Sequence, residues 1–166
     1  MENQKQLHII RHGKSSWDFD EISDIDRPLS PRGVNNAYMM ARRLKDNGII
    51  PDLIISSPAN RALYTAVIFA RVMEIPWNKI DINENIYMGY SEDILRILEK
   101  IDNKYSSVFI FGHNPTFTVL ANHFLAEQVD NIPTAGMVGL TFSLSGWNEV
   151  AKTRPDSEYF DYPKKG

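Results

Sequence analysis

Four side chains of this protein could together bind and attack a phosphoryl group. Arg11 and His12 follow a short apolar segment, Arg61 lies in the first turn of an expected helix, and His113 follows another apolar segment. Two guanidinium groups supply fixed positive charge for an anion. A neutral imidazole can act as a nucleophile when an acceptor holds its other nitrogen. The four residues therefore predict an anion-binding site for which phosphate is the natural ligand.

The expected secondary structure brings these residues to one place. Segments 7–10, 53–55 and 108–111 are short and apolar, as buried strands are, and amphipathic stretches of helical length separate them. This alternation predicts an α/β domain, a three-layer sandwich whose mostly parallel central sheet carries helices on both faces. Ligands in such folds bind beyond the carboxyl ends of the strands, where backbone N–H groups of helix N-termini also favour anions.

The rest of the chain fits the same pattern. Residues 14–29 are polar and acidic and predict a loop. Helices are expected at 31–48, at 62–73, from 91 onward and at 115–125, with Ser30, Ser57, Ser91 and Asn114 as N-caps. Further extended segments are expected at 79–82, 138–144 and 159–162. No repeat or linker divides the chain, so residues 1–166 are expected to form a single domain.

Composition excludes several other functions. The chain has 166 residues, of which 43% are hydrophobic and 23% charged, as in ordinary globular proteins. Its net charge of −3 argues against a nucleic-acid partner. Cysteine is absent, which excludes disulfides, thiolate zinc sites and a cysteine nucleophile. Without a signal-like N-terminus or a long apolar run, we expect no membrane partner and a cytoplasmic location.

Several separate segments resemble the histidine phosphatase superfamily, in particular its SixA-like phosphohistidine phosphatase branch. They are IIRHGKSSWD at 9–18, DRPLSPRG at 26–33, LIISSPANRALYTA at 53–66, FGHNPTFTVLANHF at 111–124 and FDYPKK at 160–165. The resemblance implies a hydrolase that forms a phosphohistidine on His12 and needs no metal or other cofactor. It also implies that Arg11 and Arg61 hold the non-bridging phosphate oxygens, while His113 donates to the phosphoryl group.

Other residues near these motifs are weaker candidates. Lys14, Ser15 and Asp18 follow the Arg-His-Gly triplet and could line the phosphate pocket. Glu84 is the candidate general acid, because many members of the wider superfamily carry an acidic residue in this part of the chain. An imidazole leaving group needs such an acid less than an alkoxide does, since the conjugate acid of imidazole has a pKa near ~6.5.

Some charged residues are expected to have structural roles only. Arg27 and Arg32 are expected to orient the loop and the following helix, and His8 and His123 have no convergent partners. The pairs Asp18/Asp20 and Asp24/Asp26 imitate an Asp-x-Asp phosphatase motif, but neither follows an apolar strand, so a solvated acidic loop is expected.

The spacing of the motifs bears on the substrate. Arg61, Glu84 and His113 are separated by intervals that one helix and one strand almost fill, so no cap domain is expected over the site. An uncapped site suits a phosphorylated side chain on a folded protein, such as a histidine-phosphotransfer domain. Two alternatives stay open: a phosphomonoesterase acting on a small phosphoester, and a phosphate-binding module that has lost turnover. The presence of all four site residues argues against the second alternative.

Overall fold

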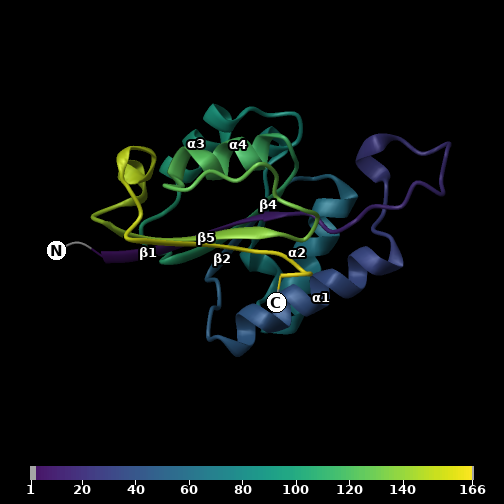
Figure 1. The fold of residues 1–166 in the computed structure, drawn as a ribbon, viewed down its shortest axis with the longest axis horizontal. Coiled ribbons are helices and arrows are strands. Elements are labelled where there is room, and N and C mark those ends of the chain that lie inside the picture. The colour runs from purple at the N-terminus through teal and green to yellow at the C-terminus, as the bar shows by residue number, and fades with distance from the viewer. Residues whose placement is uncertain (1–2, 166) are drawn as a thin grey trace.

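The computed structural model describes residues 3–165, which form one mixed sheet with helices on both sides (Figure 1). The strand order is β3-β2-β4-β1-β5-β6. The parallel strands are β1 (Asn3–Arg11), β2 (Leu53–Ser56), β3 (Ile80–Ile82) and β4 (Ser107–Gly112). The antiparallel strands are β5 (Met137–Leu144) and β6 (Ser157–Asp161). The expectation of a mostly parallel sheet is thus confirmed.

Two pairs of helices cover the sheet. Helices α1 (Pro31–Asp46) and α2 (Asn60–Met73) lie on one face, and α3 (Ser91–Glu99) and α4 (Thr116–Phe124) lie on the other (Figure 1). Each face of the sheet packs against its helices in a separate hydrophobic cluster. Within residues 3–165, the loops between these elements contain four short 3-10 turns: η1 (Asp24–Asp26), η2 (Trp77–Lys79), η3 (Glu84–Ile86) and η4 (Trp147–Lys152). The three-layer arrangement without a cap domain is therefore confirmed.

Local chemistry explains the start of α1. The Ser30 hydroxyl accepts a hydrogen bond from the Gly33 backbone N–H at 3.0 Å, and Pro31 occupies the first helical position. Gly33 also lets α1 approach the chain that follows β1, because a Cβ there would lie 2.1 Å from the Lys14 carbonyl oxygen. The N-cap predicted at Ser30 is confirmed.

The other three predicted N-caps are wrong by one or two residues. The N-cap residues of α2, α3 and α4 are Ala59, Tyr90 and Pro115. Ser57 instead accepts a hydrogen bond from the Ala59 backbone N–H in the turn before α2. Asn114, although outside the helix, still accepts from the Thr118 backbone N–H at 3.2 Å. Side chains that precede a helix can bind its first turn without standing at the cap position, which a sequence pattern does not resolve.

Strand β1 is longer than its apolar segment. Lys5 lies within it and is only 1% exposed. Burial is possible because its ammonium group donates to the carbonyl oxygens of Asn103 and Tyr105 at 2.7 and 3.0 Å. A charged residue thus extends the buried strand toward its N-terminus, whereas the apolar pattern alone would begin the strand at Leu7.

The carboxyl ends of the parallel strands coincide. Arg11 at the end of β1 pairs with Gly112 at the end of β4, and Ser56 at the end of β2 pairs with Phe111. The loop between β1 and α1 extends outward from this edge of the sheet (Figure 1). The turn after β3 lies at the same edge, because β3 runs parallel to β2. Within residues 3–165, no helix combines the length and apolar character that a membrane span requires.

Candidate active site

The structure brings Arg11, His12, Arg61 and His113 together at this edge of the sheet. The imidazole rings of His12 and His113 have centroids 5.3 Å apart. The positive charges of Arg11 and Arg61 both act on the His12 ring and lower its pKa. Thr65 links two of the contributing segments, since its hydroxyl accepts from the Gly13 N–H at 3.0 Å and donates to the Arg61 carbonyl at 2.7 Å. The predicted convergence of the four residues is therefore present in the fold.

His12 is held with one nitrogen available for attack. Its Nδ1 lies 2.6 Å from the Gly13 carbonyl oxygen, which can only accept, so Nδ1 carries the proton. Nε2 then has the free lone pair of a nucleophile. Burial lowers the His12 pKa to about 3. The hydrogen bond to Gly13 raises this pKa, and the positive charges of Arg11 and Arg61 lower it. His12 is consequently neutral and nucleophilic at physiological pH.

Both arginines are anchored at one end of the guanidinium group. Arg11 donates from Nη1 to the Ile132 carbonyl at 2.9 Å. Arg61 donates from Nη1 to the Asp24 carbonyl at 2.7 Å and from Nη2 to the Asp24 carboxylate at 3.0 Å. Within residues 3–165, the buried Nε atoms of both arginines have no hydrogen-bond partner. Each fixed group therefore keeps a buried donor available for an anion.

His113 presents a third such donor. Its Nε2 lies 2.7 Å from the Ser57 hydroxyl, which already accepts from the Ala59 N–H at 3.1 Å. No other acceptor for the Ser57 proton is found in the described part of the chain, so Ser57 donates to Nε2 and the imidazole proton resides on Nδ1. That Nδ1 is buried and has no partner within residues 3–165. Burial, followed by the charge of Arg61, lowers the His113 pKa to about 4.

Removing the Ser57 hydroxyl should impair the site without removing a group that touches the phosphoryl. We expect Ser57→Ala to lower kcat about tenfold, because the His113 ring loses the hydrogen bond that fixes its tautomer and its orientation. Ser56→Ala is the matched control, since the neighbouring Ser56 hydroxyl bonds only to the Ser57 carbonyl in the described structure. Steady-state kinetics on both variants measure the difference. Equal losses in the two variants would contradict the positioning role of Ser57.

The lowered histidine pKa values predict an unusual pH response. His8, His12 and His113 have pKa values of about 4, 3 and 4, in each case chiefly because of burial. An unfolded chain takes up these protons near pH 6.5, so it binds more protons than the folded chain below that pH. The free energy of unfolding should therefore fall as the pH drops from 7 to 5. Urea unfolding measures this change, and NMR titration should show three histidine rings still neutral at pH 5.

Asp24 is a site residue that sequence reasoning missed. Its carboxylate accepts from Arg61 Nη2, lies 3.3 Å from Arg27 Nε and accepts from the Tyr87 hydroxyl at 2.6 Å. The bond from Tyr87, followed by the bond and charge of Arg61, holds the Asp24 pKa below its usual value. The expected solvent exposure of this loop holds at Asp24, whose side chain is 53% exposed, but its carboxylate also binds groups of the site. Its neighbour Asp26 is exposed and accepts only from Ser23, at 2.9 Å, in the described structure.

Tyr87 was also missed by sequence reasoning, and it lies close to His113. The Tyr87 ring packs edge-on against His113 with centroids 5.7 Å apart. Glu84 stands on the same turn, η3, and its side chain is exposed. No hydrogen bond or ion pair joins Glu84 to Arg11, His12, Arg61 or His113 in the described structure. The turn after β3 thus brings the Tyr87 hydroxyl to the edge of the site, and the role of Glu84 as general acid stays a prediction.

The three weaker candidates after the triplet have different positions. Ser15 is buried and forms an isolated bridge with Leu29. Lys14 and Asp18 have exposed side chains. Within residues 3–165, no hydrogen bond or ion pair joins the side chains of these three residues to the four central ones. The Lys14 backbone instead helps to seat α1, because its carbonyl accepts from the Ser30 N–H at 2.8 Å. Their roles in binding phosphate stay predictions.

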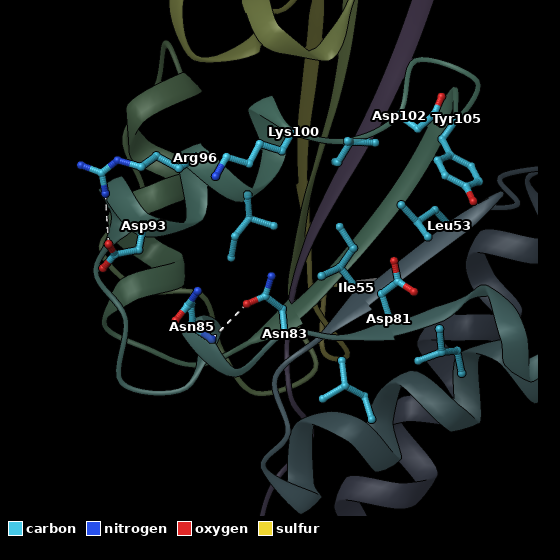
Figure 2. Close-up of a pocket in the computed structure, with 14 residues that line it drawn as sticks. Leu53, Ile55, Asp81, Asn83, Asn85, Asp93, Arg96, Lys100, Asp102 and Tyr105 are labelled. Atoms are coloured by element: carbon cyan, nitrogen blue, oxygen red, sulfur yellow. Dashed lines mark hydrogen bonds and ion pairs between the residues drawn. The ribbon is translucent and has the colours of Figure 1, made fainter.

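A hollow of about 680 Å³ lies elsewhere, between β3 at the sheet edge and α3 (Figure 2). Figure 2 shows Asn83 and Asn85 at its border, joined by a bond from the Asn85 N–H to the Asn83 side chain. None of its lining residues belongs to the cluster around His12. No group of three or more possible metal-binding His, Asp or Glu side chains is found among residues 3–165.

Comparisons with known proteins agree with this geometry. The family model described as histidine phosphatase superfamily (branch 1) matches residues 7–94. An uncharacterised chloroplastic protein of Arabidopsis thaliana is 43% identical over an alignment of 176 positions that covers 94% of this chain and 80% of the relative. The range matched by the family model includes the triplet at 11–13 and the segment around Arg61.

Solved structures extend the agreement to the whole chain. A candidate phosphohistidine phosphatase SixA from Nakamurella multipartita superposes with a TM-score of 0.81 at 20% identity and covers 98% of both chains. The protein histidine phosphatase SixA in complex with tungstate gives a TM-score of 0.77 at 22% identity, covering 95% of this chain and 97% of the other. The chain therefore belongs to branch 1 of the histidine phosphatase superfamily and has the uncapped fold of its SixA-like members.

Proposed function

We propose that this protein is a phosphohistidine phosphatase that acts on phosphorylated proteins and needs no metal ion. One observation carries the proposal. The buried Nε atoms of Arg11 and Arg61 and the buried Nδ1 of His113 have no partner within residues 3–165, and all three side chains act electrostatically on a neutral His12. Buried donors without partners are rare, and here they suit the oxygens of a phosphoryl group. The neighbour that binds tungstate, a tetrahedral oxyanion like phosphate, gives independent support.

The proposed reaction has two steps. The substrate phosphohistidine reacts with its second ring nitrogen protonated from solvent. His12 Nε2 attacks phosphorus, and the P–N bond to the substrate breaks with its electron pair moving to the departing nitrogen, so the substrate leaves as a neutral imidazole. The phosphorylated His12 ring keeps its proton on Nδ1, which still donates a hydrogen bond to the Gly13 carbonyl oxygen. Water then attacks phosphorus, releases inorganic phosphate and restores neutral His12. In both steps Arg11, Arg61 and His113 stabilise the negative charge on the three equatorial oxygens.

The choice of phosphohistidine as substrate follows from the lack of a proton donor close to His12 among the described residues. The described residues provide no acid bonded to His12, and Glu84 lies exposed on η3. A phosphoester releases an alkoxide-like oxygen that needs a proton donor, whereas an imidazole leaves readily at neutral pH. A site with strong phosphoryl binding and no close acid therefore suits phosphohistidine.

Comparison of substrates tests the proposal directly. The value of kcat/KM should be at least about 100-fold higher for a histidine-phosphorylated protein than for any of a panel of small phosphoesters. The assay should include EDTA, which we expect to leave the rate unchanged. A preference for a phosphoester, or loss of activity with the chelator, would contradict the proposal. The first outcome would favour the alternative of a small-molecule phosphomonoesterase.

The leaving group also determines what Glu84 contributes. If Glu84 reaches the leaving group through water, Glu84→Gln should lower kcat about tenfold on a phosphoester and by less than about twofold on phosphohistidine. Glu92→Gln, an exposed carboxylate change on α3, is the control. Parallel assays of both variants on both substrates measure the effect. Equal losses on the two substrates would defeat the leaving-group argument.

A further inference from the structure

We infer that an exposed apolar and acidic rim beside His12 docks the surface of a folded substrate protein, one that carries basic residues around its phosphohistidine. The inference rests on the proposed function and names the surface that recognises the substrate. The docking rim consists of two segments: residues 17–22, with Trp17, Phe19 and Ile22, and residues 88–90, with Met88 and Tyr90.

These side chains are exposed although they are large and apolar. Trp17 is 73% exposed, Phe19 54%, Met88 83% and Tyr90 75%, and Ile22 is 38% exposed. Exposed apolar groups that gather on one surface commonly mark interaction sites, and aromatic residues contribute most strongly to protein interfaces. None of these five side chains belongs to the two hydrophobic clusters of the core, so the exposure of so much apolar surface in two segments next to the site needs another cause.

Direct contacts join the rim to the phosphate site. The Trp17 indole lies against the Arg27 guanidinium, whose central carbon is 3.5 Å from the ring centroid. Arg27 pairs with Asp24, which binds both Arg61 and the Tyr87 hydroxyl. Tyr87 immediately precedes Met88, so the contact between Asp24 and Tyr87 holds the two segments of the rim together. The rim is thus connected through Asp24 to the contacts that hold Arg61 in place.

Charge selects the kind of partner. Residues 15–26 contain five carboxylates and no lysine or arginine, and Asp18, Asp20 and Glu21 are exposed. The arginines that hold phosphate lie deeper, where Arg61 is 6% exposed. The acidic groups of the rim repel a free polyanionic metabolite before it reaches the arginines deeper in the site. The same acidic groups attract a protein that carries basic side chains around its phosphorylated histidine. Such a protein also covers the apolar side chains, which a small phosphoester cannot reach.

The test compares the same leaving group, histidine, as a free amino acid and as part of a folded protein. The probes are the free amino acid phosphohistidine and a histidine-phosphotransfer domain phosphorylated with phosphoramidate, prepared with either lysines or glutamates beside the histidine. We expect the double variant Phe19→Ser/Tyr90→Ser to lose at least about tenfold in kcat/KM on the lysine-bearing domain. Its kcat/KM on free phosphohistidine should stay within about twofold of the wild type.

The matched control is Trp77→Ser. Trp77 is 59% exposed, but it stands in η2 before β3, at the opposite end of the sheet from His12. This variant should behave as the wild type on every probe. Asp20→Asn/Glu21→Gln should reduce the preference for the lysine-bearing domain over the glutamate-bearing one, and 0.5 M NaCl should have the same effect.

The outcomes separate the two claims. If the wild type hydrolyses neither phosphohistidine probe, the proposed function fails. If it hydrolyses both and the rim variant retains its rate on the domain, the docking inference is overturned. Equal losses on both probes also overturn it, since they indicate damage to the catalytic site. A wild-type dimer that the rim variant converts to monomer in sedimentation would assign the rim to a second copy of the chain instead.

Discussion

His12→Ala should abolish phosphatase turnover, with a loss of at least about 10⁴-fold in kcat. In the proposed mechanism His12 supplies the nitrogen that forms the covalent intermediate, so in the variant Arg11, Arg61 and His113 would bind a phosphoryl group that no protein atom attacks. Wild-type protein mixed briefly with labelled phosphohistidine substrate should give a phosphoprotein that is labile in acid and stable in alkali. The variant should give none.

His123→Ala is the matched control for this change. His123 lies on α4, is exposed, and has the Ala151 carbonyl as its partner at 2.8 Å. It should retain full activity and form the phosphoprotein. Because the His12 ring is buried, circular dichroism must show that His12→Ala is folded. A folded variant that still turns over substrate would disprove the assignment of His12 as nucleophile.

The sequence was sufficient to predict the architecture and the convergence of the four central residues. Short apolar segments separated by amphipathic helices predict parallel strands, and parallel strands place Arg11, His12 and His113 at one edge irrespective of the details of the loops. Arg61 joins them because its helix begins directly after β2. These conclusions depend only on chain direction and strand order, which tolerate an error of one or two residues in the element boundaries.

The surrounding groups depend on loop conformation and could not be found in this way. Asp24 lies 37 positions before Arg61 in the chain, and Tyr87 lies 63 positions after Asp24, yet the three side chains bond to one another. No periodic pattern encodes such a contact. The mistaken N-cap at Ser57 has the same origin, because a serine before a helix predicts a cap until the neighbouring histidine is placed in space.

The contact between Arg61 and Asp24 leads to the second large expected effect. Arg61→Ala should lower kcat/KM by about 10²–10³-fold, because a buried donor to the phosphoryl oxygens is lost. Part of this loss should arise from Asp24, whose carboxylate then faces the phosphate without its arginine. Arg71→Ala is the control, since Arg71 lies on the same helix and its exposed side chain bonds to the Tyr38 hydroxyl.

A double-mutant cycle separates the two contributions. Asp24→Asn alone should lower kcat/KM, because Arg61 loses a charged anchor. The same change made in the Arg61→Ala background should raise kcat/KM several-fold, because it removes a negative charge that only Arg27 then offsets. Opposite signs in the two backgrounds would show that Asp24 acts through Arg61. Losses of equal size in both backgrounds would show that Asp24 supports only the loop, and full activity of Arg61→Ala would remove Arg61 from the proposed site. Measured together, the four proteins test whether the loop after β1 is part of the phosphate-binding machinery, which its exposed and acidic sequence does not suggest.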